Sequence, residues 1–309
     1  MASPIFIIGL PRSGSTLWLN VFAENPNIFR MGEMLFLTPW RKDFRYFLRR
    51  KVGDLSDERN IEKMIELIFS DENVRGITGS FWQYDIANVN NTLLKKKLFH
   101  RILESDKSIE SIFKILIEEI THFSGYNRCC MKFPVYVNFV PELLQWYPEC
   151  KIVHIIRDPR AMAISRKNDP GGTSKKIKKY TSLRFIIKMI MVFFVVCQYI
   201  WTSRLHCKYK KFKNYSLFKY EDLLADPEKV IRELCKFTEI DFVPEMLVPS
   251  EGQASSVTGK RQKGFDKKSA SRWKTVISPL ENIIITFLTK ESMRRFEYDP
   301  KNHSVYFND

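Results

Sequence analysis

Two short stretches of the chain carry residues whose types and spacing could do chemistry. The first, GLPRSGST at residues 9–16, has two glycines separated by four residues and closes on hydroxyl side chains. That spacing is typical of a phosphate-binding P-loop, in which main-chain N–H groups and a helix N-terminus surround an oxyanion. Ser15 stands where the lysine that handles the β- and γ-phosphates of a nucleotide is expected. The loop therefore predicts an oxyanion site made of main chain, hydroxyls and the Arg12 guanidinium, with no metal required; the alternative is a tight turn without a ligand.

The second stretch, RDPRAMAIS at residues 157–165, directly follows the apolar run KIVHII at 151–156. Ligands of open parallel sheets bind outside the carboxyl ends of the strands, so this stretch and the first loop are expected at the same edge. Arg157 can bind a phosphate through two parallel hydrogen bonds, and Ser165, about two helical turns later, can add a hydroxyl. Taken alone, RDPR could equally be a helix cap with surface arginines. The pair of stretches predicts two separate phosphate sites under one ligand.

The elements that must position these residues alternate along the chain. Four apolar runs predict buried strands, at residues 4–9, 128–133, 151–156 and 215–220. Helical patterns lie between and after them, at residues up to 24 and at 57–69, 108–123, 141–147, 183–208 and 226–240. This alternation predicts an α/β fold of the P-loop type, with three layers and a central parallel sheet flanked by helices. No linker separates domains, so residues 1–309 are expected to form a single domain.

Composition sets limits on the class of protein. The 309 residues are 44% hydrophobic and 14% aromatic, which supports a large core and excludes a disordered chain. A net charge of +15, from 50 Lys and Arg against 35 Asp and Glu, favours anionic partners. The six cysteines show neither metal-ligand nor disulfide spacing, which predicts buried thiols in a reducing compartment. No signal segment is recognised, and the apolar stretch 185–201 contains Lys188 and is interpreted as part of a long helix buried on most sides, so a cytoplasmic location is expected.

The pair GLPRSGST and RDPRAMAIS resembles the sulfotransferases that use 3′-phosphoadenosine 5′-phosphosulfate (PAPS) as co-substrate. The likeness continues, in blocks, through KYEDLLADPEKVIREL (219–234), SSVTGKRQKGFDKKSASRWK (255–274) and FEYDP (296–300). It is weakest over residues 40–125, and a helical insertion that shapes the acceptor site is expected over roughly residues 34–125. The missing P-loop lysine fits a donor that has no β/γ-phosphate chain and loses a sulfuryl group.

The resemblance implies a role for each matching residue. The 5′-phosphosulfate would be held by the first loop, and the 3′-phosphate by Arg157 and Ser165. Tyr220 would lie near the nucleotide, and the tail 255–274, which contains Lys263 and ends at Trp273, would cover it. The implied nucleotide-binding residues are Pro11, Arg12, Ser13, Gly14, Ser15, Thr16, Arg157, Ser165, Tyr220 and Lys263.

The catalytic residues follow from one branch of that family. The cytosolic branch uses a histidine base in a K-x-H-x-P segment, but the corresponding stretch here is Lys132-Phe133-Pro134, and His154 falls inside a buried strand. Another branch, which includes the tyrosylprotein sulfotransferases and some bacterial sulfotransferases, uses a glutamate after the first helix. Glu33, in NPNIFRMGE, matches that pattern and is the candidate base; the alternative is an exposed acid or a salt-bridge partner. Lys132 and Arg12 would stabilise charge on the leaving oxygen.

Two other classes remain open from the residues alone. A P-loop kinase or NTPase is disfavoured by Ser15, and a non-catalytic polyanion-binding protein is suggested by the basic stretches 41–51 and 175–179. Nucleic acid is an unexpected partner, whereas an acidic or membrane surface stays open as a use of the basic stretches. The resemblance implies a sulfate acceptor with a hydroxyl or amine, on a small molecule, glycan, lipid or peptide, and does not select among these.

Overall fold

In the computed structural model of the chain, the residues described are 2–32, 36–38, 43–69, 91–167, 184–250 and 264–300. By their contacts they group into two compact units. Unit 1 draws on Met1–Ile8 and Pro26–Ile152, and unit 2 on Gly9–Asn25 and Val153–Asp309. Each unit is described by itself below. The assignment of one domain to residues 1–309 stays a prediction.

The described strands form a five-stranded parallel sheet in the order β2–β3–β1–β4–β5, as predicted for an α/β fold. The bounds are Ile5–Gly9 for β1, Ile28–Met31 for β2, Arg128–Lys132 for β3, Lys151–Ile156 for β4 and Tyr215–Lys219 for β5. All residues of β1 and β4 are buried, which is the pattern of interior strands covered on both faces. The edge strands β2 and β5 are only partly buried. The four predicted strands are confirmed, and β2 was not predicted.

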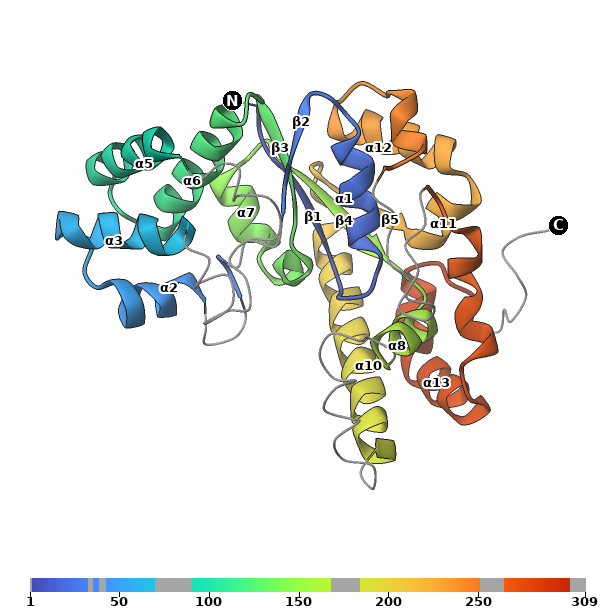
Figure 1. Cartoon of the computed structure of the whole chain (residues 1–309). Coiled ribbons are helices and arrows are strands. Elements are labelled where there is room, and N and C mark those ends of the chain that lie inside the picture. The colour runs from blue at the N-terminus through green and yellow to red at the C-terminus, as the bar shows by residue number, and fades with distance from the viewer. Residues whose placement is uncertain are drawn as a thin grey trace. The chain divides into compact units, whose positions relative to one another are not determined.

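In unit 1, helices surround the pairing of β3 with β1 and β2. Ile7 is in register with Lys132, and Met31 with Met131. The helices α3, α5 and α6 pack together (Figure 1), and the apolar face of α6 carries Phe113, whose ring stacks on that of Phe6 at 6.3 Å between centroids. The elements of unit 1 between these strands are α2 (Phe44–Phe47), the π-helix η1 (Leu48–Val52), α3 (Glu58–Phe69), α5 (Thr92–Glu104), α6 (Ile109–Phe123), the 3-10 helix η3 (Pro134–Asn138) and α7 (Val140–Trp146). Where residues 34–125 are described, their regular elements are thus helical.

Unit 2 places helices after β1, β4 and β5. The bounds are Ser15–Ala23 for α1, Pro159–Lys167 for α8, Arg184–Tyr209 for α10, Tyr220–Ala225 for α11, Pro227–Thr238 for α12 and Pro279–Arg295 for α13, with the 3-10 helices η4 (Pro244–Leu247), η5 (Lys267–Ala270) and η6 (Arg272–Thr275). Local signals explain their starts. Asp226 caps α12 ahead of Pro227, and Ser278 and Glu281 form a capping box on α13. The predicted helices are confirmed to within one or two residues.

The long helix α10 differs from its prediction as a helix buried on most sides. Its buried residues Val192, Val195, Val196 and Tyr199 pack in a cluster with Ile285 and Met293 of α13. Among the described residues, its stretch Ile186–Tyr209 alone is long and apolar enough to cross a membrane, with 39% of the most apolar window buried. Cys197 and Cys207 on this helix are exposed, so the prediction of buried thiols holds only for the other four cysteines. Much of the outer surface of α10 is therefore apolar and uncovered.

Candidate functional site

The loop between β1 and α1 has the features of an anion site. Gly14 caps α1 in the left-handed conformation (φ +93°), and no side chain caps the first turn of the helix, which also lacks an acidic residue. Ser13 is fully buried, and its Oγ has no hydrogen-bond partner among the described residues. Buried hydroxyls are normally hydrogen-bonded, and a helix N-terminus favours negative charge. The loop thus offers a buried donor and a positive helix end to an oxyanion.

The loop needs glycine at positions 9 and 14 because other atoms of the chain lie very close to its backbone there. A Cβ on Gly9 would lie 2.4 Å from the carbonyl oxygen of Ile155, and a Cβ on Gly14 would lie 2.2 Å from Cδ2 of Tyr220. The first contact brings the end of β1 against β4, and the second brings the start of α1 against the ring of Tyr220. Both distances are below any real carbon contact, so the loop can hold its place only with glycine at these positions.

A hydrogen bond joins the two stretches that were singled out in the sequence. Arg12 adopts a left-handed backbone conformation (φ +76°), and its Nε donates to Ser165 Oγ at 3.0 Å. Ser165 lies in α8, the helix that follows Arg157, and is nearly buried. Residues 153 positions apart thus meet, as expected if both stretches lie at one edge of the sheet.

Arg157 stands at the centre of a second set of contacts. Its guanidinium lies over the ring of Tyr220, 4.3 Å from the centroid, and its Nη2 donates to the carbonyl oxygen of Ser269 at 2.8 Å. The hydroxyls of Tyr220 and Ser269 are 2.7 Å apart. Arg157 Nε is buried and has no hydrogen-bond partner in the described part of the chain. Since Tyr220 also contacts Gly14, the ring connects the loop with the arginine, and a free guanidinium donor remains for a ligand.

Arg160 is a structural residue rather than the surface arginine of the alternative interpretation. It is 1% exposed, and its guanidinium forms a bidentate pair with Asp158, at 2.9 and 2.6 Å. The other face of the guanidinium lies 4.6 Å from the ring centroid of Trp273. Asp158 also accepts from the Arg160 N–H at 2.8 Å, so the capping part of that interpretation is correct. The ion pair of Arg160 with Asp158 and the contact of Arg160 with Trp273 together hold the turn that carries Arg157 next to the tail that ends at Trp273.

Glu221, a residue that sequence reasoning missed, supports the same turn. Its buried carboxylate accepts from the N–H of Asp158 at 3.0 Å and from the hydroxyl of Tyr298 at 2.6 Å. Burial raises the pKa of Glu221, against the lowering effect of the nearby Arg157. Glu221 follows Tyr220 in the chain, and Asp158 follows Arg157. The hydrogen bond between Glu221 and Asp158 therefore holds the segments after β4 and β5, which carry Arg157 and Tyr220, close together.

The other predicted site residues are placed as follows. Ser15 and Thr16 begin α1, Ser15 being buried and Thr16 half-buried, and Pro11 is half-buried in the loop. Lys132 is the last residue of β3 in unit 1, is 5% exposed, and is followed by Phe133, whose N–H donates to the carbonyl of Ile7. Glu33 and Lys263 lie outside the described residues. The predicted nucleotide-binding residues that meet directly are therefore Arg12 with Ser165, and Gly14 and Arg157 with Tyr220.

His154 is held in a buried polar cluster with Tyr215 and His206. It is fully buried in β4, and its Nδ1 hydrogen-bonds the hydroxyl of Tyr215, which also contacts Nδ1 of His206 at 2.9 Å. Burial first, and then the nearby His206, lower the pKa of His154 to about 3. A neutral imidazole so enclosed is a structural group, in line with the doubt about a histidine base.

His154 predicts a pH dependence of stability. The imidazole of an unfolded histidine has a pKa near 6.5. Between about pH 6.5 and 3, His154 is therefore protonated in the unfolded chain and neutral in the folded chain. Stability from this group is complete above pH 6.5 and is lost as the pH falls toward 3, by an amount on the order of a few kcal/mol. We expect thermal unfolding of His154→Gln to show a flatter pH dependence in this range, from a lower starting stability. His100→Gln, which changes an exposed histidine of α5, should keep the wild-type slope; equal slopes for both variants would contradict the assignment.

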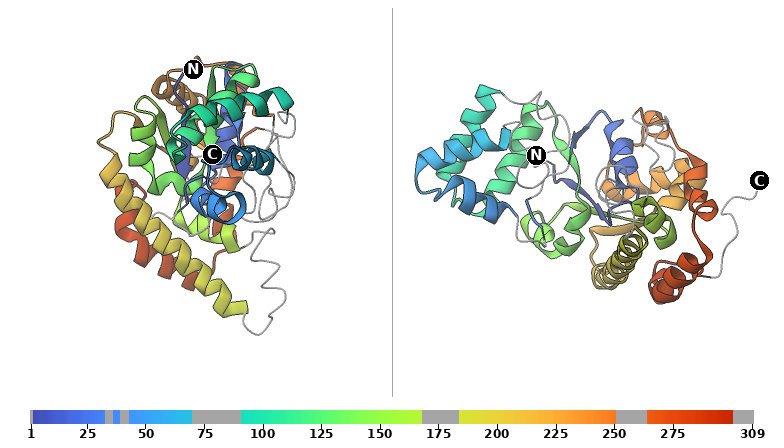
Figure 2. Two further views of the ribbon diagram at one scale, coloured as in Figure 1. Left: turned by 90° about the vertical axis from the view of Figure 1, so that its left-hand side faces the viewer. Right: turned by 60° about the horizontal axis from the view of Figure 1, so that its bottom comes forward.

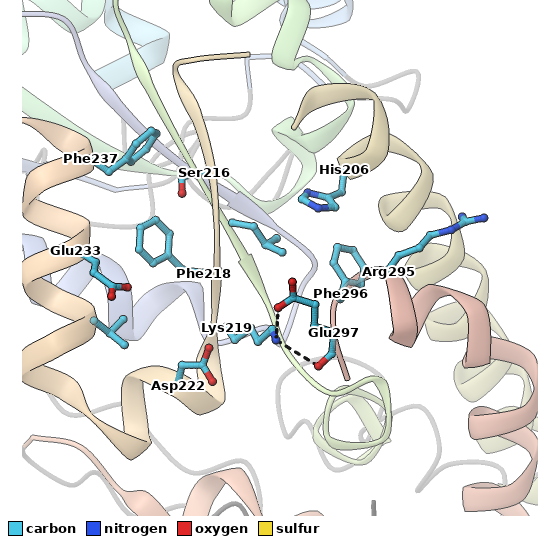
Figure 3. A pocket seen from close by; sticks show the side chains of 12 residues that line it. His206, Ser216, Phe218, Lys219, Asp222, Glu233, Phe237, Arg295, Phe296 and Glu297 are labelled. Carbon is cyan, nitrogen blue, oxygen red and sulfur yellow. Dashed lines mark hydrogen bonds and ion pairs between the residues drawn. The ribbon is translucent and has the colours of Figure 1, made fainter. Parts of the chain in front are cut away.

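Unit 2 also contains a pocket of about 420 Å³, which fits an anion less well than the loop does (Figure 3). It lies beside β5, and its lining includes three carboxylates, those of Asp222, Glu233 and Glu297. Glu297 pairs with Lys219 at 3.2 Å, and Asp222 has a raised pKa because it is partly buried. No group of three or more His, Cys, Asp or Glu side chains in the described ranges is arranged to hold a metal ion. Carboxylates repel a polyanion, so the loop rather than this pocket fits a phosphate group.

Comparisons with known proteins show the family and the fold of the chain. A family model described as "Sulfotransferase family" matches residues 4–244. Two solved structures have the same fold: the sulfotransferase domain of the olefin synthase from Synechococcus PCC 7002 (19% identity, TM-score 0.57, covering 96% of this chain and 95% of that one) and the sulfotransferase domain from the curacin biosynthetic pathway (18%, 0.56, 97% and 99%). An uncharacterized protein of Aquifex aeolicus (strain VF5) is 22% identical over 305 residues. These cover 96% of this chain but 33% of that relative, so the chain spans about a third of its length.

Proposed function

We propose that the chain, which belongs to the sulfotransferase family, is a sulfotransferase whose loop 9–16 and stretch 157–165 bind the two ends of PAPS. The observation that carries this proposal is the contact of Tyr220 with both Gly14 and Arg157, which makes the loop and the arginine parts of one site. The hydrogen bond from Arg12 to Ser165 supports it independently.

Each end of the co-substrate would be held by donors that fit it. Main-chain N–H groups of the loop, the hydroxyls of Ser13, Ser15 and Thr16, and the Arg12 guanidinium would hold the 5′-phosphosulfate, and Pro11 and Gly14 shape that loop. The buried Ser13 Oγ, unpartnered in the described part of the chain, fits this role. Arg157 and Ser165 would hold the 3′-phosphate, where the buried Arg157 Nε offers a donor. Tyr220 and Lys263 complete the proposed nucleotide-binding set.

PAPS supplies the sulfuryl group, and we propose that residues of this chain manage the proton and the charge. Glu33 takes the proton of the acceptor hydroxyl or amine as its oxygen or nitrogen bonds to sulfur. Lys132 and Arg12 place positive charge at the oxygen that keeps the electrons of the broken sulfur–oxygen bond. The acceptor is a hydroxyl or amine compound.

Loss of Arg157 should weaken binding of adenosine 3′,5′-bisphosphate. A hydrogen bond to a charged group contributes roughly 1.5–3 kcal/mol, so Arg157→Ala is expected to raise the dissociation constant about ten- to a hundredfold. Binding of AMP, which lacks the 3′-phosphate, should change little. Isothermal titration calorimetry measures both, with Arg294→Ala as a control that removes an exposed arginine of α13. An unchanged dissociation constant in Arg157→Ala would refute the assignment of the 3′-phosphate site, and preferential binding of ATP with Mg²⁺ by the wild type would favour a kinase.

A further inference from the structure

Positive charge is concentrated in one part of the chain. Residues 170–220 contain 12 of the 50 Lys and Arg and none of the 35 Asp and Glu. This segment, less than a fifth of the chain, therefore accounts for most of the net charge of +15. It includes α10, whose last turns carry Arg204 and Lys208; in the sequence four lysines at 175–179 precede the helix, and Lys210, Lys211 and Lys213 follow it.

The outer surface of α10 is an apolar stripe that ends in cations. Residues spaced by three and four share one side of a helix, and here that side is exposed. Ile190 and Phe193 are each 61% exposed and Trp201 is 52% exposed. The stripe along this side reads, in chain order, Ile186, Ile190, Phe193, Cys197, Trp201, Arg204 and Lys208.

Helix α13 extends the same kind of surface. Its exposed apolar residues include Leu280, Ile283 and Phe287 at spacings of three and four, with Phe287 78% exposed, and the adjacent Leu288. The helix packs against α10 (Figure 2). The acid of its first turn, Glu281, is turned inward and paired with Lys167 at 2.9 Å.

The two helices run side by side in the same direction. About midway along α10 and near the start of α13, Arg166 lies over the ring of Phe194 while the adjacent Lys167 pairs with Glu281. Further along both helices, Ser203 of α10 hydrogen-bonds Ser292 of α13 at 2.9 Å. The first half of α13 therefore lies beside the part of α10 that begins near Phe194. The exposed apolar residues of 186–194 and 280–287 are here named the α10–α13 surface.

We propose that the α10–α13 surface docks the protein on a bilayer that contains anionic lipid. Exposed apolar patches rimmed by cations are typical of helices that lie in the membrane interface, with aromatic rings at the level of the headgroups. Trp201, placed between the apolar residues and Arg204, matches that order. The inner side of α10 is covered by α8 and α13, so α10 lies along the membrane rather than crossing it.

Charge argues for lipid over a second copy of the chain. A symmetric pair joined through this surface would bring α10 and the described residues that follow it, 184–220, of both copies close together, and these contain eight cations in each copy and no acid. An anionic membrane instead neutralises them, since each lysine or arginine near such a surface binds favourably. The proposal does not depend on the identity of the sulfuryl donor or acceptor.

Vesicle co-sedimentation tests the proposal on the full chain. We expect binding to vesicles of about 70% phosphatidylcholine and 30% phosphatidylserine, weakening as salt is raised, and little binding to phosphatidylcholine alone. The variant Ile190→Glu/Phe193→Glu should bind the mixed vesicles at least about tenfold more weakly, because two apolar side chains that would enter the bilayer become charged. Leu93→Glu, at a 57% exposed leucine of α5, is the matched control and should bind like the wild type.

Each other outcome would overturn the proposal. Equal binding of the double variant and the wild type would show that α10 does not enter the bilayer. Absence of vesicle binding, together with a dimer in light scattering that the double variant dissociates, would assign the surface to a second copy. Equal thermal unfolding midpoints of the double variant, the control and the wild type would show that loss of fold does not cause the weaker binding.

Discussion

Replacing Glu33 by glutamine is expected to lower the turnover number about 10²–10⁴-fold while leaving the affinity for adenosine 3′,5′-bisphosphate unchanged. A positioned base contributes about that factor, and the amide of glutamine matches the shape of the carboxylate but takes no proton. The measurement is the steady-state rate with PAPS and an acceptor found by screening hydroxyl and amine compounds, alongside calorimetric binding of the bisphosphate.

The control for Glu33 is another carboxylate of the same unit. Glu58→Gln changes an exposed acid in the first turn of α3 and should keep the wild-type rate. A Glu33→Gln rate within a few-fold of the wild type would remove Glu33 as the base. Weakened bisphosphate binding with an unchanged rate would instead make it a partner of the loop arginines.

Gly14→Ala should nearly abolish nucleotide binding and lower the melting temperature. The new Cβ would lie 2.2 Å from the ring of Tyr220, at a backbone conformation (φ +93°) that costs a non-glycine residue about 1–3 kcal/mol. The clash is relieved only if the loop or the ring moves, and the Arg157 guanidinium lies over that same ring, 4.3 Å from its centroid. Since more than one charged hydrogen bond would be lost, the dissociation constant of the bisphosphate should rise about a hundredfold or more by calorimetry.

Gly125→Ala separates backbone strain from the steric clash. Gly125 also has a positive φ (+82°), but a Cβ there would meet nothing within 4 Å. This variant should lose some stability and keep full nucleotide affinity. The double variant Gly14→Ala/Tyr220→Ala should regain part of the melting temperature without regaining affinity, because the ring that supports Arg157 is gone. Full affinity in Gly14→Ala would mean that the ring contact does not position the site.

Strands and helices with strong local patterns could be predicted from the sequence. The runs at β1 and β4 are apolar throughout because both faces of these strands are buried. β2 escaped prediction because it is four residues long and contains Arg30, so it lacks the length and the apolar run by which a buried strand is recognised. The exposure of the outer side of α10 was not predicted, because composition shows that a helix is apolar but not which of its sides is covered.

The site was predictable where a motif carries its own local geometry. The loop at 9–16 and the arginine after β4 have fixed spacings to a strand and a helix, so their edge of the sheet follows from topology. Ser269 contributes a main-chain carbonyl, which any residue has, and so left no signal in the sequence. Glu221 and Arg160 look like surface charges in the sequence, and only long-range contacts show that they are buried. For Glu33 and Lys263 the sequence prediction stands by itself.

The contacts of the loop also have a consequence for synthesis of the chain. Arg12 meets Ser165, Gly14 meets Tyr220, and Arg157 meets Ser269, so each of these residues finds its partner only after more than a hundred further residues have been made. A ribosome-bound chain that ends before residue 264 has the loop but lacks Ser269 and Trp273. The proposed nucleotide site would therefore assemble only after synthesis has passed Trp273, and a bound nucleotide would stabilise a chain of that length against shorter ones.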